Sequence, residues 1–439
     1  MAKPWHEMKE KLNSKSPSFC LAKWTQVTLH LQNGHTQSCH HPSTHKVPIE
    51  ELNVNPSALH NTKFKKEKRK EMLNGIRPKE CDYCWRVEDA APEMFSDRHY
   101  KSSFSWSEPH FNKIAAMEGD ENFDPTYVEV SFGNACNFKC MYCAPHISSK
   151  WMEEIKQHGP YPTSGQYNNL EWLEHAGQMP IPEREYNPYE EAFWKWWPRL
   201  YKTLHTFRIT GGEPLMNKNT FKVLDYIQQT EEPNTNLLLG VNANFGVPDK
   251  LFDKFLKQSR EILDSNKLRK LEIYTSVEAW DNKNDYIRFG MNYNEFIKRV
   301  AKCIETLPDV PITFMCAYNA LSISSFTKFL KDIEVIRKKY GKKSVYVDIP
   351  YVRHPDFLDC KIMNEGDLIE ESWKYMANSK WFDDDETAKM ERIFKYWKHQ
   401  QQWDHSKHRN DLRTYVHELD KRRGTDFVKT FPEFKEYYE

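Results

Sequence analysis

The sequence lacks a net charge, a long apolar run and a hydrophobic leader. Its 439 residues include 63 Lys and Arg and 63 Asp and Glu, so the formal net charge at pH 7 is zero. This balance argues against a nucleic-acid partner held by bulk electrostatic attraction. No apolar run approaches the roughly 20 residues that a membrane-spanning helix needs, and Met1–Glu7 lacks the apolar stretch of a signal peptide. We expect a cytoplasmic protein with neither a membrane nor a nucleic-acid partner.

The composition is that of a globular protein with a polar surface, with 39% hydrophobic and 29% charged residues. Ten cysteines in a reducing compartment are not expected to form disulfides. Cys303, Cys316 and Cys360 stand alone in apolar or mixed segments, and we predict buried, inert thiols there. The other seven cysteines fall into two groups, which the sequence separates by about 50 residues.

The second group has the spacing C-x3-C-x2-C and consists of Cys136, Cys140 and Cys143. It follows Tyr127–Phe132, a β-branched and aromatic segment that predicts a strand running into a loop. Three thiolates on one tight loop are typical of a metal site. A four-iron, four-sulfur ([4Fe-4S]) cluster bound by three cysteines would keep one iron open to chemistry. On spacing alone, a zinc site that adds His146 is the alternative.

The first group comprises Cys20, Cys39, Cys81 and Cys84. The first two flank an alternating strand pattern with the hairpin turn signal Asn33-Gly34, and the last two form a C-x2-C knuckle. Four thiolates meeting at one metal would saturate it, so such a site would carry electrons or hold structure. An auxiliary [4Fe-4S] cluster, a structural zinc and no shared site all remain open.

Strand and helix patterns alternate from Tyr127 to about Pro350. The predicted strands are Tyr127–Phe132, Thr206–Thr210, Asn236–Val241, Lys270–Ser276, Ile312–Tyr318 and Ser344–Ile349. The helical patterns between them include Lys218–Gln229, Asp249–Leu263, Tyr293–Thr306 and Ile323–Lys339. Six such units predict an α/β fold, a partial (β/α)6 TIM-like barrel of parallel strands. We divide the chain into an N-terminal cysteine-bearing region (1–110), a core barrel (120–355) and a C-terminal helical extension (356–439).

Three segments outside the predicted strands have structural interpretations. The basic run Lys63–Lys70 is interpreted as a solvated helix face rather than a nucleic-acid contact. The insertion at 159–204 contains Trp194–Trp197, which favours an amphipathic helix packed on the barrel over a substrate-contact surface. The C-terminal extension is interpreted as a helical cover without chemistry. Its expected anchors are Tyr396, Trp397, Trp403 and Phe434.

Polar side chains follow the predicted strands, at the edge where parallel barrels place their chemistry. Paired glycines admit close approach of a ligand to the backbone, and a carboxylate beside them can accept from an ammonium group. Hydroxyl, amide and guanidinium groups suit a polar ligand, with turn or capping roles as the alternative. The candidates are Gly211, Gly212, Glu213, Asn242, Asn244, Ser276, Glu278 and Arg288, with Asn319 and Pro350-Tyr351-Val352 as further lining residues.

The cysteine loop, with Tyr142 just before its third cysteine, resembles the signature of the radical SAM superfamily. The segment Gly211–Pro214 resembles the motif that holds the amino group of S-adenosylmethionine (SAM) in that family. The resemblance implies a catalytic [4Fe-4S] cluster on Cys136, Cys140 and Cys143, SAM on the open iron, and a 5'-deoxyadenosyl radical formed by reductive cleavage of SAM.

The same resemblance assigns roles to the polar candidates. Ser276 and Glu278 would contact the ribose hydroxyls or neighbouring SAM atoms, and Arg288 would pair with the SAM carboxylate. Asn242 and Asn244 would line the cofactor or the substrate. The N-terminal cysteine hairpin looks like the opening of the twitch and SPASM domains, which bind auxiliary [4Fe-4S] clusters but usually follow the core rather than precede it.

From the resemblance we expect a radical SAM enzyme that abstracts hydrogen from a substrate, with an auxiliary cluster beside it. A peptide or protein substrate and a flavodoxin- or ferredoxin-type electron donor are the expected partners. A small metabolite or nucleotide is the alternative substrate. A non-catalytic iron–sulfur or zinc protein is the alternative class, and the glycine pair with Glu213 and Arg288 argues against it.

Overall fold

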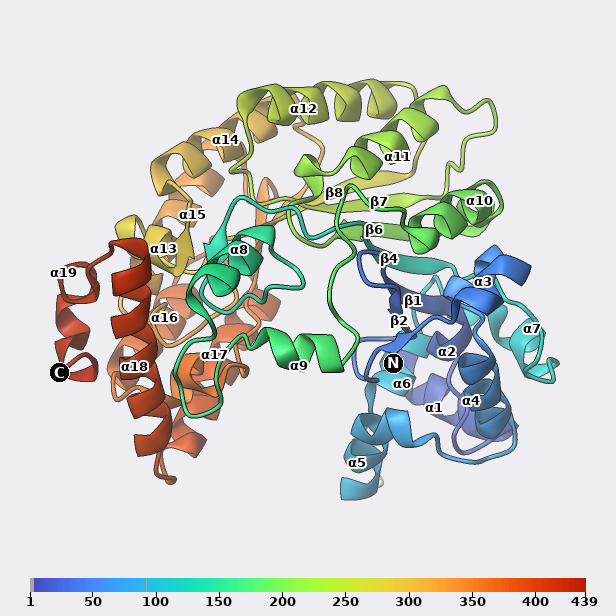
Figure 1. The fold of residues 1–439 in the computed structure, drawn as a ribbon, viewed down its shortest axis with the longest axis horizontal. Coiled ribbons are helices and arrows are strands. Elements are labelled where there is room, and N and C mark those ends of the chain that lie inside the picture. Colours follow the sequence, from blue (N-terminus) through green and yellow to red (C-terminus); the bar gives the residue numbers. More distant parts are fainter. Residues whose placement is uncertain (1–3, 92) are drawn as a thin grey trace.

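The computed structural model describes residues 4–91 and 93–439 and shows a mixed α/β fold around one large sheet (Figure 1). In this part of the chain the strand order is β11-β10-β8-β7-β6-β4-β1-β2-β3. The bounds are β1 Gln26–His30, β2 His35–Gln37, β3 His45–Lys46, β4 Tyr127–Ser131, β6 Thr206–Thr210, β7 Leu238–Asn242, β8 Lys270–Ser276, β10 Ile312–Met315 and β11 Val345–Asp348. Neighbouring strands are parallel from β11 to β1, whereas β2 pairs antiparallel with both β1 and β3.

Helices follow most of the strands, and α11, α12, α14 and α15 arch along the outside of the sheet in Figure 1. The helices are α1 Pro4–Lys15, α2 Ala22–Thr25, α3 Ile49–Val54, α4 Lys63–Leu73, α5 Asp82–Ala90, α6 Asp97–Ser102, α7 Phe111–Ala115, α8 Ser149–His158, α9 Leu170–His175, α10 Pro188–Thr203, α11 Lys218–Gln229, α12 Asp249–Asp264, α13 Asn282–Ile287, α14 Tyr293–Thr306, α15 Phe326–Tyr340, α16 Gly366–Asn378, α17 Asp384–Gln400, α18 Ser406–Arg423 and α19 Phe427–Thr430. Side-chain caps define several starts, as at Asn217 before α11 and Asn292 before α14.

The six strands predicted from the sequence are all present, as β4, β6, β7, β8, β10 and β11, with ends shifted by at most a few residues. This confirms a mixed α/β fold with a large, mostly parallel sheet. The structure adds that the N-terminal cysteine-bearing region shares this sheet, because β1 pairs in parallel with β4. The predicted turn at Asn33-Gly34 joins β1 to β2, and Gly34 has a φ of 72°, which favours glycine.

The two faces of the sheet differ in polarity. Val130, Ile209 and Val241 are fully buried on one face, in the same hydrophobic core as Leu224 of α11 and Phe255 of α12. The alternate residues on the opposite face, which we call the inner face, are mostly polar and half-buried, because successive side chains of a strand point to opposite faces. The inner-face residues include Tyr127, Glu129, Arg208, Thr210, Asn242, Glu272, Tyr274, Ser276, Thr313, Met315, Tyr346 and Asp348.

The insertion forms α10, and Trp196 and Trp197 are buried in the main core, as expected for a packed amphipathic helix. In the C-terminal extension Phe434 is buried and Trp397 packs against the same core. The prediction that Trp403 anchors this extension is wrong, because its side chain is 50% exposed beyond the end of α17.

The prediction that Lys63–Lys70 is a solvated helix face is wrong for two of its residues. Lys65 and Arg69, one turn apart on α4, are fully buried. Lys65 donates to Thr36 Oγ1 at 2.8 Å, and Arg69 donates to Asn61 Oδ1 at 2.8 Å. A charge run does not reveal which of its members face a core, because long basic side chains can find polar partners inside.

None of the helices in the described residues is long and apolar enough to cross a membrane. Cys303, Cys316 and Cys360 are buried in the main core, as predicted for inert thiols.

Candidate functional site

The C-x3-C-x2-C loop leaves β4 at the carboxyl edge of the sheet and forms the short strand β5 (Lys139–Cys140). This strand pairs antiparallel with β9 (Arg288–Phe289), and the register sets Cys140 opposite Arg288. Burial raises the pKa of Cys140 to about 12, with the Arg288 charge acting against this rise and Cys136 adding to it. Burial also raises the pKa of Cys143, and Cys140 and Cys136 raise it further. The three thiols are therefore close enough to act on one another, as ligands of one cluster must be.

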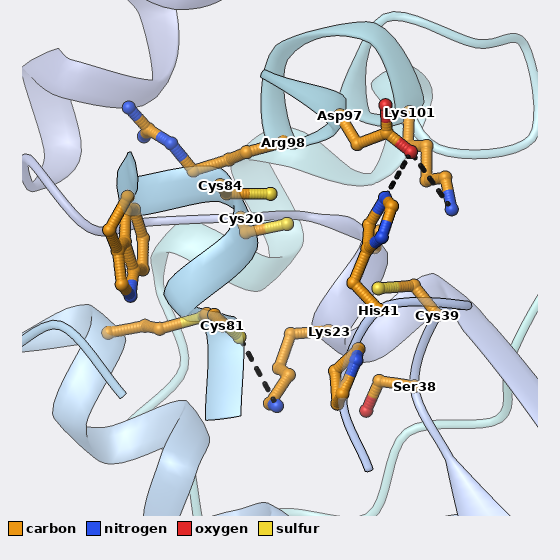
Figure 2. A pocket seen from close by; sticks show the side chains of 14 residues that line it. Cys20, Lys23, Ser38, Cys39, His41, Cys81, Cys84, Asp97, Arg98 and Lys101 are labelled. Atoms are coloured by element: carbon orange, nitrogen blue, oxygen red, sulfur yellow. Dashed lines mark hydrogen bonds and ion pairs between the residues drawn. The ribbon is translucent and has the colours of Figure 1, made fainter. Parts of the chain in front are cut away.

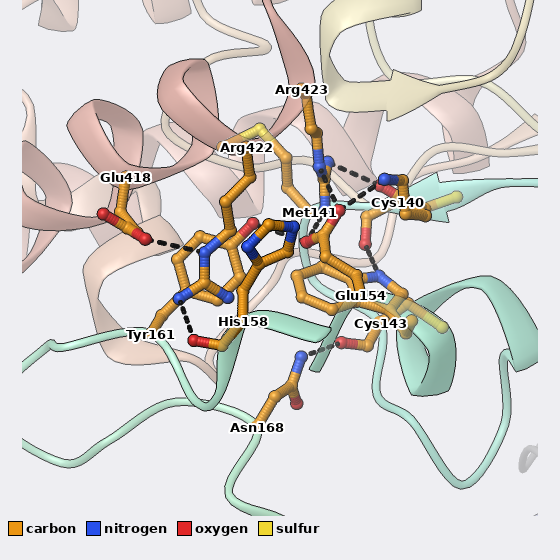
Figure 3. A network of polar contacts seen from close by, with 12 residues as sticks. Cys140, Met141, Cys143, Glu154, His158, Tyr161, Asn168, Glu418, Arg422 and Arg423 are labelled. Atoms are coloured by element: carbon orange, nitrogen blue, oxygen red, sulfur yellow. Dashed lines mark hydrogen bonds and ion pairs between the residues drawn. The ribbon is translucent and has the colours of Figure 1, made fainter. Parts of the chain in front are cut away.

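Side chains from α8 and the following insertion hold the backbone of this loop. Trp151 Nε1 donates to the Cys140 carbonyl at 2.8 Å. Tyr167 Oη donates to the Cys143 carbonyl at 2.8 Å. Asn168 Nδ2 donates to the same carbonyl at 3.1 Å, as Figure 3 shows. These bonds reach across 11 to 25 residues and fix the path of the chain between the second and third cysteines.

The C-terminal helix α18 also holds the loop. Tyr415 Oη donates to the Met141 carbonyl at 2.9 Å, and Arg423 Nη1 donates to the Lys139 carbonyl at 2.9 Å. Arg423 is ion-paired with Glu154 of α8 at 3.1 Å, and both side chains are almost fully buried (Figure 3). Burial alone would raise the pKa of Glu154, but hydrogen bonds from Arg423, Lys139 and Tyr161 lower it to about 2.

The glycine pair lies directly against the cysteine loop. Glu213 N donates to the Ala135 carbonyl at 2.7 Å, and a Cβ on Gly212 would lie 2.2 Å from that same oxygen. Gly211 has a φ of 106°, a conformation that favours glycine. Only residues without a side chain let this segment approach the loop so closely.

Glu213 points into the protein, with 2% of its surface exposed. Its carboxylate accepts from Leu215 N at 3.0 Å and from Asn244 N at 2.6 Å. Burial raises the pKa of Glu213 to about 7, although these amide donors oppose the rise. Within 4.0 Å it has no ion-pair partner among the described residues, so a cation bound here would find a buried carboxylate ready to accept.

Tyr142 of the three-cysteine loop forms one hydrogen-bonded group with the buried side chains of Glu278 and Arg288. Arg288 Nη1 donates to Tyr142 Oη at 2.6 Å and to Glu278 Oε1 at 3.0 Å, and Tyr142 Oη donates to Glu278 Oε1 at 2.6 Å. The second oxygen of Glu278 and Nε of Arg288 have no partner among the described residues although both are buried. Buried polar atoms without partners are rare in native proteins, so these two atoms are available to a bound molecule or water.

The remaining candidates lie along the same edge. Asn244 Nδ2 donates to Asn137 Oδ1 at 2.8 Å and so connects the loop after β7 to the cysteine loop. Asn242 lies on the inner face and accepts from Arg208 Nε at 2.9 Å. Ser276 ends β8 and is half-buried on the same face. The structure thus brings the predicted SAM-binding residues to one edge of the sheet, and their contact with SAM stays a prediction.

The four N-terminal cysteines line a single cavity (Figure 2). Cys20 precedes α2, Cys39 follows β2, and Cys81 and Cys84 lie at the start of α5. Burial raises the pKa of Cys81 to about 12; Lys23 opposes the rise, whereas Cys20, Cys39 and Cys84 add to it. The four thiols therefore lie near one another around this cavity.

Cations surround this cavity. Lys23, Arg98 and Lys101 line it. The fully buried Lys65 lies near Cys39, but burial lowers the pKa of Lys65 well below its usual value, with Cys39 acting against this fall. Lys23 Nζ is 3.9 Å from Cys81 Sγ and is ion-paired with Glu80. Lys65, by contrast, has only the Thr36 hydroxyl as a polar partner within the described part of the chain. Positive charge beside these thiols opposes the rise in pKa that burial causes and fits an anionic metal–thiolate centre.

Neither thiol group is a ready-made site for a single ion, because among residues 4–91 and 93–439 no three Cys, His, Asp or Glu side chains are close enough to hold one metal. A zinc site at the three-cysteine loop would need His146. Burial, together with the charge of His35, lowers the pKa of His146 to about 4. The donor chemistry of the two sites, three thiols and four thiols, fits iron–sulfur clusters.

An open groove adjoins the three-cysteine loop. It is lined by Tyr142, His146, Asn168 and Trp172, together with His408 of α18. Trp172 is 62% exposed at its edge. The groove gives a large molecule a route to the loop, because such a molecule could contact Trp172 and Tyr142 together.

Sequence comparison finds curated relatives. The chain is 27% identical over 143 residues to the GTP 3',8-cyclase of Sulfurovum sp. (strain NBC37-1), which covers 32% of this chain and 35% of that protein. It is 23% identical over 210 residues to the GTP 3',8-cyclase of Campylobacter lari, covering 48% and 49% of the two chains. This similarity supports the radical SAM superfamily. The chain thus spans at most about half the length of these two relatives, and no protein-family model matches it.

Among solved structures, Streptococcus suis SuiB bound to S-adenosylmethionine has a TM-score of 0.36 and 13% identity, covering 82% of this chain and 69% of that one. Likeness at this level does not establish a common fold. The radical SAM interpretation therefore rests on the curated relatives and on the cysteine loop with its glycine pair.

Sequence reasoning missed several residues at this site. Tyr415 and Arg423 lie in a segment that was expected to carry no chemistry, and nothing in their local sequence indicates a contact nearly 300 residues away. Glu129 and Arg208 were missed although a signal exists. Parallel strands are usually continuous apolar runs, so a charge in the middle of one marks a polar inner face.

Proposed function

We propose that this chain is a radical SAM enzyme with a second iron–sulfur centre. Cys136, Cys140 and Cys143 would hold the catalytic [4Fe-4S] cluster. When bound, this cluster and SAM supply a 5'-deoxyadenosyl radical that abstracts hydrogen from a substrate. The observation that carries the proposal is the direct contact between the three-cysteine loop and the Gly211–Glu213 segment, which joins the two parts of the signature in one site.

The residues of this chain would orient the cofactor and keep it from water. Glu213 offers a buried carboxylate to the SAM ammonium, and its pKa of about 7 lets a bound cation draw it into the ionised form. The unpartnered atoms Glu278 Oε2 and Arg288 Nε would be available to polar groups of SAM. Trp151, Tyr167 and Tyr415 hold the loop carbonyls and so keep the thiols in one arrangement.

The four-cysteine cavity would hold an auxiliary [4Fe-4S] cluster, which supplies an electron acceptor when bound. A substrate that loses a hydrogen atom and then one electron is oxidised overall. Zinc has no redox chemistry and would make the same cavity purely structural. A flavodoxin- or ferredoxin-type protein would deliver the electron that SAM cleavage consumes.

We propose a peptide or protein substrate, which the open groove beside Tyr142 and Trp172 could admit. A nucleotide is the second candidate, and the similarity to GTP 3',8-cyclases favours it. Either substrate would bring its reacting carbon to the carboxyl edge of the sheet, where parallel α/β barrels bind their ligands.

The test is release of 5'-deoxyadenosine from SAM by the anaerobically reconstituted protein with dithionite. We expect turnover by the wild type and none by Cys140→Ala, which lacks a cluster ligand. Cys303→Ala, which removes a buried thiol far from the loop in sequence, is the control and should retain activity. Turnover by Cys140→Ala at the wild-type level would contradict the proposal, and no turnover by the wild type would favour the non-catalytic class.

A further inference from the structure

Arg208, in the middle of β6, is a charged side chain that the proposed function has not yet used. It is half-buried on the inner face. The strand register sets Glu129 of β4 on one side of it and Gly240 of β7 on the other. A guanidinium at the centre of a parallel sheet costs desolvation energy, so it needs a compensating contact.

The Arg208 side chain is held flat across β7. A Cβ on Gly240 would lie 3.3 Å from both Arg208 Cγ and Tyr274 Cε2, so the glycine leaves the space that Arg208 occupies. Arg208 Cζ lies 4.1 Å from the centroid of the Tyr274 ring, and Nε donates to Asn242 Oδ1 at 2.9 Å. The guanidinium is therefore fixed in direction before any ligand arrives, which reduces the entropy that binding costs.

No carboxylate pairs with this guanidinium. Of the acidic groups in the described part of the chain, none lies within 4.0 Å of it, whereas the buried Arg337 and Arg423 pair with Glu386 and Glu154. Burial alone would lower the pKa of Arg208, but Glu129, Tyr127 and Tyr274 raise it, so the side chain stays charged. The hydroxyl of Tyr127 is within its reach as a neutral partner.

The surroundings of Arg208 connect the inner face to the four-cysteine cavity. Lys101 lines that cavity and acts on Glu129. Burial, together with the charges of Lys101 and Arg208, lowers the pKa of His40, which is next to Cys39 in sequence, to about 4. A ligand on Arg208 would thus lie beside the N-terminal cysteine region and on the same face as Asn242 and Ser276.

We propose that Arg208, fixed by Tyr274 and Asn242 in the space that Gly240 leaves, binds an anionic group of the substrate, a carboxylate or a phosphate. This inference rests on the proposed function, because it names a group that the substrate carries. A guanidinium presents parallel N–H donors whose spacing matches both groups.

The two candidate substrate classes differ in the anion that they supply, so the probes are chosen to separate them. Calorimetry on the cluster-loaded protein with SAM would use GTP, penta-alanine with a free C-terminal carboxylate, and penta-alanine with a C-terminal amide. We expect GTP or the free-acid peptide to bind, and the amide to bind more weakly than the acid. Arg208→Met should weaken the binding about 10- to 100-fold, as expected for loss of a charged hydrogen-bond donor.

Gly240→Ala keeps the charge of Arg208 but crowds the Arg208 and Tyr274 side chains, so it should also weaken binding. This variant is the second test of the inference if Arg208→Met fails to fold. Arg260→Met, which removes a partly exposed arginine paired with Asp264, is the control and should change nothing. Binding of GTP alone assigns a phosphate, and binding of the free-acid peptide alone assigns a carboxylate.

Binding of neither anion by the wild type, or equal affinity in Arg208→Met, would overturn the inference. Deoxyadenosine release, measured without substrate on the same variants, keeps this outcome separate from the proposed function. Variants that still cleave SAM but have lost probe binding support the inference, whereas a wild type that binds the probes without cleaving SAM contradicts only the function.

Discussion

The two cysteine groups of this protein are built in opposite ways. The three-cysteine loop is short in sequence, and its backbone is held by side chains from α8, the insertion and α18. The four N-terminal cysteines come from three separate segments and are surrounded by Lys23, Lys65, Arg98 and Lys101. Three thiols leave an iron for chemistry, and four saturate a centre. On the proposed function, the first site would hold a loop around an open position, and the second would surround a closed, anionic centre with basic side chains.

The largest effect on this comparison is expected when metal ligands are removed from the four-cysteine site. Replacing Cys81 and Cys84 together with Ala should lower the iron content after reconstitution from about eight to about four per chain, since one of two four-iron clusters is lost. SAM cleavage uncoupled from substrate should persist. Iron, sulfide and zinc analysis checks this. Four irons and one zinc in the wild type would make the N-terminal site structural.

Arg423→Ala tests whether side chains of α18 hold the backbone of the three-cysteine loop. This variant removes one of the two cations paired with the buried Glu154, the other being Lys139, and should cost about 1.5–3 kcal/mol of unfolding free energy, as for loss of a hydrogen bond to a charged group. Denaturant unfolding measures this cost, and loss of iron to a chelator measures the effect on the loop. Tyr415→Phe removes one hydrogen bond to the Met141 carbonyl and should cost about 1 kcal/mol. Lys421→Ala on the same helix, with its side chain 79% exposed, is the control. Unchanged stability and iron retention in Arg423→Ala would show that α18 only covers the loop.

Arg288→Ala should weaken SAM binding by about 1.5–3 kcal/mol through loss of a charged hydrogen-bond donor. The structure adds that the substitution leaves Glu278 buried without its partner. The double variant with Glu278→Gln therefore separates the two effects. Calorimetry on the cluster-loaded proteins would give the dissociation constants, and an unchanged constant would make Arg288 structural.

The smallest effect expected is a pH dependence through Glu213. Burial raises its pKa to about 7, so the carboxyl is neutral below that pH and ionised above it. Because only the ionised form attracts the SAM ammonium, affinity should rise between pH 6 and pH 8 by about 10-fold and level off above, following the ionised fraction. Calorimetry at several pH values on the wild type and Glu213→Gln checks this. A dependence that is equal in the two proteins would assign it to another group.

The sequence was sufficient to predict the structural elements that a local residue pattern encodes. The six parallel strands and the glycine pair are found from β-branched segments, glycine doublets and spacing, and the structure contains them. What the sequence could not supply are contacts between distant segments. The bond from Tyr415 to the Met141 carbonyl spans 274 residues, and the burial of Lys65 depends on where β2 places Thr36. The pairing of β1 with β4 was also not predicted, because 96 residues separate the two strands and strand order is a property of the assembled sheet.

The claim that one centre is open and the other closed is tested most directly by electron paramagnetic resonance of the reconstituted, dithionite-reduced protein with and without SAM. The wild type should show two cluster signals, and SAM should change one of them. That SAM-sensitive signal should remain in the Cys81→Ala, Cys84→Ala double variant and be absent from Cys140→Ala. A spectrum that SAM does not alter, or a SAM-sensitive signal that survives in Cys140→Ala, would contradict the account.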